Sequence, residues 1–187
     1  AVEEFFRILS QRMRARLVNR VGSNFQVRTV SVMVKQLGDA FDDSMEDGVF
    51  CMLRFDALRL AGPAAMERSL LTGIIGAMLG DEGGAEDDAV EGEDRPLSLV
   101  EQRIAERVFL DLSNDLCLVW PIHPSPTIVL DGSPGSSRVA DTGAMDEDVY
   151  VGELQFGPPD EPYGTMYTTI PVQVLRGIEG KGGVSEE

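Results

Sequence analysis

The sequence predicts an α+β fold in which long helices pack on a sheet rich in antiparallel strands, and in which one half of the chain repeats the architecture of the other. Each half starts with a long helix of apolar periodicity and continues into short runs rich in β-branched residues. Apolar residues make up 43% of the 187 positions, enough for a single core. We expect one domain at 1–178, with pseudo-repeats at about 1–80 and 98–178, an acidic loop at 81–97 and a flexible tail at 179–187.

The first half opens with a predicted helix over residues 2–21, which Gly22 can end. Its apolar positions recur every fourth residue, as on one face of an amphipathic helix: Phe5, Leu9, Met13, Leu17 and Val21. Residues 25–36 are rich in β-branched side chains and predict a strand, with Val30, Val32 and Val34 on one face.

A second strand is predicted over residues 48–57, where Val49, Cys51, Leu53 and Phe55 alternate, and we expect it to pair with the first strand. Pro63 is expected in the first turn of a helix, because proline is favoured there and apolar residues follow at helical spacing as far as Met78.

The second half starts with a capping box, because Glu101 follows Ser98 by three residues. Apolar periodicity then predicts a long helix to Trp120, which Pro121 closes. Residues 127–130, 148–156 and 163–170 are predicted strands, and a short helix or turn is expected over 171–178.

Charge is distributed unevenly along the chain. The net charge of −16 argues against binding to nucleic acid or to anionic lipid. Residues 1–36 nevertheless hold seven basic and two acidic side chains, whereas residues 37–97 hold 15 acids and four arginines. Arg12, Arg16 and Arg20 form a basic stripe on the first helix, which we expect to contribute to packing against an acidic face of a neighbouring copy.

No pattern of chemically active residues predicts catalysis, a cofactor or a metal. The acidic segment 81–94 carries eight acids in 14 positions but lacks the ligand spacing of an EF-hand. No glycine-rich phosphate loop follows a strand. His123 is the single histidine, in a proline-dense stretch with no triad partners, and we expect a surface position for it. The sequence therefore favours a protein that is not an enzyme.

Two cysteines, Cys51 and Cys117, lie far apart in apolar segments, which predicts reduced core thiols. The longest nearly uncharged stretch, 69–80, is too short to span a bilayer. The start of the chain lacks the pattern of a signal peptide. These observations together favour a cytoplasmic protein.

The order of these elements resembles the middle domain of the FliM family of flagellar motor switch proteins. The helix SLVEQRIAERVFLDLSNDLCLVWP is similar to the central helix of that domain, and AVEEFFRILSQRMRARL to its first helix. The segment LRLAGPAAMERSLLTGIIGAMLGDEGG is similar to its next helix and glycine loop, and DVYVGELQFGPPDEPYGTMYTTIPVQVLRGI to its closing strands. The resemblance implies a pseudosymmetric fold of the CheC and FliM type.

The resemblance also implies a role as a scaffold in the cytoplasmic ring of the bacterial flagellar motor, at the inner membrane but not inserted in it. In that family a glycine loop contacts the rotor protein FliG, and the matching residues here are Gly80, Asp81, Glu82, Gly83 and Gly84, in which the two acids interrupt the usual glycine pair. Neighbouring copies pack side by side. FliN and phosphorylated CheY are expected to bind mainly through flanking segments that this sequence lacks.

Two other functions stay open. A CheC-like phosphatase of phosphorylated CheY would use an acidic residue and an asparagine three positions later on a helix. Asp111 and Asn114 have this spacing, but Arg107 stands where that family has Asp or Ser. The second alternative is a ring protein of a related type III secretion apparatus.

Overall fold

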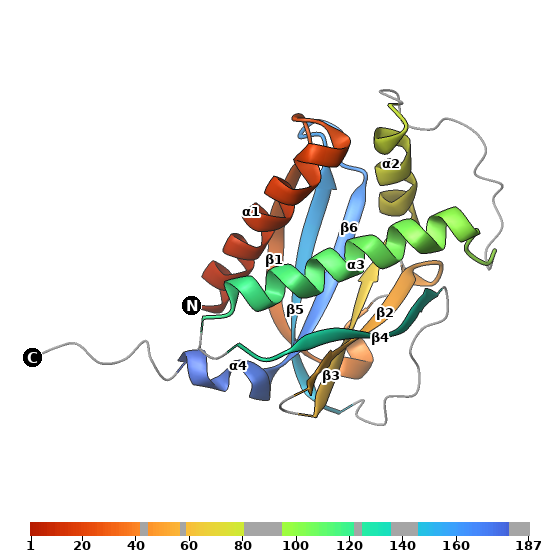
Figure 1. Cartoon of the computed structure of the whole chain (residues 1–187). Coiled ribbons are helices and arrows are strands. Elements are labelled where there is room, and N and C mark those ends of the chain that lie inside the picture. The colour runs from red at the N-terminus through yellow and green to blue at the C-terminus, as the bar shows by residue number, and fades with distance from the viewer. Residues whose placement is uncertain (42–44, 57–58, 81–94, 122–124, 136–145, 180–187) are drawn as a thin grey trace, which may run out of the picture.

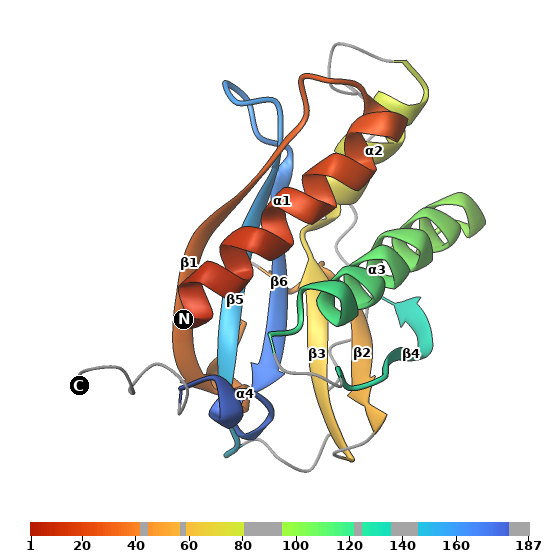
Figure 2. The ribbon, with the colours of Figure 1, turned by 60° about the vertical axis from the view of Figure 1, so that its left-hand side comes forward.

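The computed structural model describes residues 1–41, 45–56, 59–80, 95–121, 125–135 and 146–179. Helices α1 (Val2–Val21), α2 (Arg68–Met78) and α3 (Leu99–Val119) lie on the same face of one sheet (Figures 1 and 2). A short helix, α4 (Val172–Glu179), follows the last strand, and a 3₁₀ turn, η1 (Leu37–Asp39), follows the first. None of the described helices is long and apolar enough to cross a membrane.

Within the described residues the sheet has six strands in the order β1-β5-β6-β3-β2-β4, and every neighbouring pair is antiparallel. The first half supplies β1 (Gln26–Gln36), β2 (Val49–Phe55) and β3 (Leu60–Met66). The second half supplies β4 (Ile128–Gly135), β5 (Asp148–Gly157) and β6 (Gly164–Pro171).

The strand order confirms the predicted pseudosymmetry. Exchanging β1 with β4, β2 with β5 and β3 with β6 converts the order of the strands into itself, read from the other end. Each half contributes a helix, three strands and a second helix. The first strand of each half leaves its own half and pairs with the hairpin of the other, so the two halves share one sheet and one core.

This exchange of strands shows that one predicted pairing is wrong. We expected the second strand to pair with the first, but β2 pairs with β3 and β4, and β1 pairs with β5. Pairing between strands of different halves leaves no local signal, because it depends on how two distant segments pack and not on a turn between them.

The predicted helix start at Pro63 is also wrong. Pro63 lies inside β3, and the helix begins five residues later at Arg68. The register with β6 covers only Ala64, Ala65 and Met66, so the missing N–H of Pro63 falls just outside it. The carbonyl of Pro63 accepts a hydrogen bond from Thr169 Oγ1 at 2.6 Å, which fixes this end of the strand to β6.

The other elements agree with the sequence patterns to within a few residues at most boundaries. Gly22 ends α1 with φ +100°, in the left-handed region that favours glycine. Ser98 and Glu101 form both hydrogen bonds of the capping box at the start of α3. Strand β4 runs five residues further than the predicted end at 130, along the edge of β2.

The main core lies between the helices and the sheet, and the aromatic side chains at its centre are Phe6, Phe55, Phe109 and Phe156. On the opposite face of the sheet, residues after β1 cover a smaller apolar area. There Leu37 and Ala40 pack against Val149 and Val151, and Met45 packs against Phe50 and Ala65. The sheet is therefore buried on both faces at its centre, so it provides a rigid base for the three helices.

Candidate functional site

Helices α1 and α3 are joined by a group of charged side chains that we call the ion cluster: Arg12, Arg16 and Arg20 from α1, and Arg107, Asp111 and Asp115 from α3. The arginines of α1 recur every four residues, and so do the charged residues of α3. Positions four apart lie on one side of a helix, so the two rows face each other.

The two aspartates are buried and the arginines reach them from outside. Only 4% of the Asp111 side chain and 1% of the Asp115 side chain are exposed. Arg16 donates to Asp115 from Nη2 at 2.6 Å and from Nε at 3.1 Å, a two-pronged contact. The hydrogen bond to Asp115 raises the pKa of Arg16 above its usual value. The cluster thus ties α1 to α3 on the solvent side of the core.

Asp111 is shared by three guanidinium groups. Arg20 Nη1 donates to Asp111 Oδ2 at 2.6 Å. Asp111 Oδ1 lies 3.5 Å from Arg107 Nε and 3.8 Å from Arg16 Nη1, and it accepts no hydrogen bond within the described part of the chain. Four arginines thus meet two aspartates, which leaves the cluster with a surplus of two positive charges.

These contacts bear on two expected or alternative roles: self-association through the arginine stripe, and phosphatase chemistry at Asp111 and Asn114. Arg16 and Arg20 are already paired with carboxylates of their own chain, while Arg12 is half exposed and its Nε lies 3.8 Å from Asp115 Oδ1. Asn114 is exposed, whereas Asp111 is buried under arginines. Asp111 and Asn114 therefore do not face solvent together, and this geometry does not favour the orientation of a water for phosphatase chemistry.

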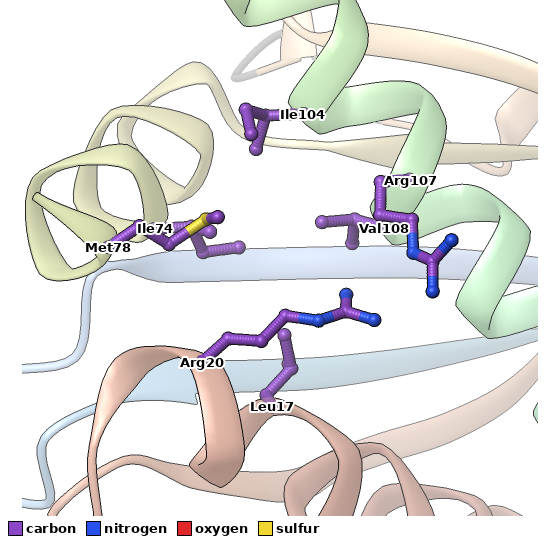
Figure 3. A pocket seen from close by; sticks show the side chains of 7 residues that line it. All are labelled: Leu17, Arg20, Ile74, Met78, Ile104, Arg107 and Val108. Carbon is purple, nitrogen blue, oxygen red and sulfur yellow. The ribbon is translucent and has the colours of Figure 1, made fainter.

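A pocket of about 180 Å³ opens beside the ion cluster, where α1, α2 and α3 come together (Figure 3). We call it the three-helix pocket, and its lining residues are Leu17, Arg20, Ile74, Met78, Ile104, Arg107 and Val108. Five of these side chains are aliphatic or thioether groups. In Figure 3 the guanidinium groups of Arg20 and Arg107 lie toward each other between α1 and α3.

Helix α2 ends next to this pocket at the predicted glycine loop. Leu79 N–H bonds back to the carbonyls of Ile75 and Gly76, both at 3.1 Å, and Gly80 has φ +78°, so the chain turns away from the helix axis there. The Leu79 side chain is 81% exposed. Gly80 is thus placed at the end of α2, whereas Asp81, Glu82, Gly83 and Gly84 lie outside the described residues.

The position of α2 is fixed by close contacts with the β5–β6 hairpin. A Cβ on Gly73 would lie 2.3 Å from Tyr163 Cγ, so only glycine lets the helix approach this ring. At the start of the helix, Thr165 N–H donates to Glu67 Oε1 at 3.2 Å, and the Glu67 N–H donates to the Thr165 carbonyl at 3.0 Å. The end of α2, with Gly80, is therefore held by a rigid support.

Among the described residues, the two cysteines have no partners that suggest chemistry. Cys51 is buried, Cys117 is half-buried, and both are free thiols. Cys117 is thus less buried than we expected. Within the described ranges no group of three or more His, Cys, Asp or Glu side chains could hold a metal ion. His123 lies outside these ranges.

Sequence reasoning did not identify the aspartate partners of the arginine stripe. The signal was present, because Asp111 and Asp115 repeat at the same four-residue spacing as Arg12, Arg16 and Arg20. Each aspartate is also followed directly by a buried leucine of α3, Leu112 or Leu116, and a buried acid needs a partner.

Comparison with solved structures identifies the architecture. A chain in the crystal structure of a FliG–FliM complex from H. pylori superposes with a TM-score of 0.77 and 17% identity, covering 90% of each chain. The FliM middle domain from Vibrio alginolyticus gives a TM-score of 0.74 at 17% identity, covering 96% of this chain and 98% of the other. The fold is that of the FliM middle domain.

A third relative widens the group that shares the FliM-type fold. FliY from Thermotoga maritima superposes with a TM-score of 0.65 and 15% identity, covering 95% of this chain and 91% of the other. No protein-family profile matches the sequence. No curated protein matches it either. The chain is therefore similar to FliM in its fold, although only 17% of the aligned amino acids are identical.

Proposed function

We propose that this protein is a switching scaffold in the cytoplasmic ring of a bacterial flagellar motor, where it binds FliG and neighbouring copies of itself and helps to set the direction of rotation. The proposal rests on the similarity of fold to a chain of a FliG–FliM complex, a superposition that covers 90% of each chain. Its place would be the cytoplasmic face of the inner membrane, as a peripheral component.

The proposed FliG contact is the loop from Gly80 to Gly84. Gly80 stands at the exposed end of α2, which close packing on Tyr163 holds in place. Loops presented by a rigid scaffold commonly carry binding functions, and glycines allow a partner's backbone to approach closely. Since Asp81 and Glu82 add two negative charges to this loop, the contact should include a basic surface of FliG and weaken with salt.

Titration of FliG from the same organism into this protein tests the proposal. Replacing both Gly83 and Gly84 with valine should weaken binding at least about tenfold, because branched side chains would block the approach of the partner. Gly135→Val is the matched control, because a Cβ at Gly135 meets no atom within 4 Å. Unchanged affinity in a double variant that keeps its circular dichroism spectrum would remove this loop from the interface.

The same titration separates the remaining alternatives. A ring protein of a secretion apparatus would not bind FliG with micromolar or better affinity. A phosphatase would accelerate loss of the phosphoryl group from CheY charged with acetyl phosphate, and we expect no acceleration, because Asp111 is enclosed by Arg16, Arg20 and Arg107.

A further inference from the structure

The three-helix pocket is small and mainly apolar. Its walls include Leu17, Ile74 and Val108, which are almost fully buried, while Met78 at the α2 side is 42% exposed. A volume of about 180 Å³ is below the roughly 300–1,000 Å³ of sites for small-molecule ligands. A single aliphatic side chain from a partner matches this volume better than a cofactor does.

Exposed apolar side chains lie close in sequence to the lining residues on two helices. On α3, Val100 precedes Ile104 by one turn and is 61% exposed, and Leu99 beside it is also exposed. On α2, Leu79 directly follows Met78. Exposed apolar surface beside a pocket is typical of sites that bind the apolar face of a partner helix.

Among the described residues, the charged side chains that line the pocket are both arginines, although the chain as a whole carries −16. Arg20 and Arg107 line the pocket and share Asp111 with Arg16, so one carboxylate serves three guanidinium groups. The Arg107 side chain is 56% exposed, and its contact with Asp111 is a 3.5 Å approach of Nε, so among the described residues no acid pairs with its Nη groups. The complementary ligand is therefore an aliphatic side chain accompanied by a carboxylate.

We propose that the three-helix pocket docks a helical, acidic segment of a partner protein. One aliphatic side chain of that segment enters the pocket between Ile74, Met78 and Ile104, and a carboxylate one turn away pairs with Arg107. A few well-packed, desolvated side chains provide most of the affinity in such interfaces, while rim charges contribute to the choice of partner. This goes beyond the proposed function, because the pocket can bind such a segment whether or not the glycine loop binds FliG.

A set of synthetic peptides tests the proposal by fluorescence anisotropy at low salt. Each peptide has about 15 residues in a helix-forming alanine and glutamine background, and carries leucine or serine at its centre and glutamate or lysine one turn away. The leucine–glutamate peptide should bind at least about tenfold more tightly than the leucine–lysine and serine–glutamate peptides. Equal binding of all peptides, or no binding, overturns the proposal.

Variants of the protein locate the binding. Arg107→Glu should weaken the leucine–glutamate peptide about tenfold and strengthen the leucine–lysine peptide, and Met78→Ser should weaken both. Arg28→Glu is the matched charge control on the exposed part of β1, where Arg28 contacts Gln155, and should change each affinity less than about twofold. An equal effect of Arg28→Glu would attribute the binding to general electrostatics and overturn the proposal.

Octanoate serves as a probe for a small-molecule site. If octanoate binds in the pocket and the peptides do not, the pocket is a site for a free aliphatic acid, and the docking proposal is wrong. FliG titration of Arg107→Glu distinguishes this inference from the proposed function: loss of peptide binding with FliG affinity retained supports a separate docking site. Unchanged peptide affinity in Arg107→Glu overturns the docking site without touching the FliG proposal.

Discussion

Asp115 is a buried partner of Arg16 in the contact between α1 and α3. Its side chain is 1% exposed and receives both hydrogen bonds of Arg16. Removing one member of a buried ion pair costs about 3–5 kcal/mol, because the other charge stays buried without a partner. Arg16 is 29% exposed and water can partly replace its partner, so the lower end of that range applies.

We therefore predict that Asp115→Asn lowers the free energy of unfolding by about 3 kcal/mol, measured by urea denaturation. Glu106→Asn is the control, since Glu106 is exposed on the same helix and its replacement should cost less than about 1 kcal/mol. Equal costs for the two variants would show that the ion cluster contributes nothing beyond helix propensity.

Cys51 should be chemically inert in the folded protein. Burial in the core raises the pKa of its thiol to about 11 from the ordinary value of 9.0, with Glu106 and Asp131 adding to the effect. Because the thiolate is the nucleophile, reaction at pH 8 is suppressed both by access and by protonation. In a Cys117→Ser variant, a bulky maleimide should label Cys51 only after denaturant is added. Rapid labelling of the native variant would contradict this.

The raised pKa of Cys51 also affects the stability of the fold at alkaline pH. The folded state holds the Cys51 proton more tightly than the unfolded state does, so this contribution is fully present below about pH 9 and is lost as the pH rises toward about 11. Cys51→Ala should lack this part of the alkaline loss of stability.

At the scale of elements, α2 depends on Gly73. A Cβ there would lie 2.3 Å from Tyr163 Cγ, whereas a Cβ on Gly76, one turn further along, meets nothing within 4 Å. We predict that Gly73→Ala destabilises the fold by about 1–3 kcal/mol through overpacking. Gly76→Ala should instead stabilise it by about 0.5–1 kcal/mol, because alanine is the better helix former. Thermal melts of both variants give the two signs, and the same sign for both would contradict this account.

How far an element could be predicted depended on whether its signal was local. Helices α1 and α3 repeat apolar residues every turn, α1 ends at Gly22 and α3 begins with a capping box, so these bounds followed from the sequence. Strand β3 could not be recognised, because LAGPAAM consists mainly of small residues and a proline, and its strand geometry comes from packing between β2 and β6. The pairing of β1 with β5 joins residues about 120 apart, for which no local pattern exists.

The candidate site, too, could be predicted only where its signal was local in the sequence. The arginine stripe was visible as a sequence pattern and the glycine loop followed from the family resemblance, but the pocket between α1, α2 and α3 was not visible in the sequence. It arises where Leu17, Ile74 and Val108 meet from three distant segments. A cavity depends on the relative placement of helices, which sequence periodicity alone leaves open.

At the scale of the whole molecule, the pseudosymmetric sheet places the basic helix α1 at one side of an otherwise acidic protein. Self-association through Arg12, Arg16 and Arg20 stays a prediction, but the structure changes how it should be tested. Reversing the charge of Arg16 or Arg20 would leave Asp115 or Asp111 buried without its closest partner, so loss of association could reflect unfolding. Arg12 is 50% exposed and lies 3.8 Å from Asp115, whereas Arg16 and Arg20 each lie 2.6 Å from their nearest aspartate, so Arg12 is the suitable position.

We predict that Arg12→Glu weakens association between copies at low salt by about threefold to tenfold, because an exposed charge pair contributes at most about 1 kcal/mol and its reversal adds repulsion. Sedimentation velocity over a concentration series gives the association constant. Arg28→Glu changes the net charge by the same amount on β1 and controls for the general repulsion between acidic molecules. Raising the salt should remove the difference between wild type and Arg12→Glu, since the charges are exposed and screened. If the two variants weaken association equally at low salt, the stripe on α1 has no specific part in the contact between neighbouring copies.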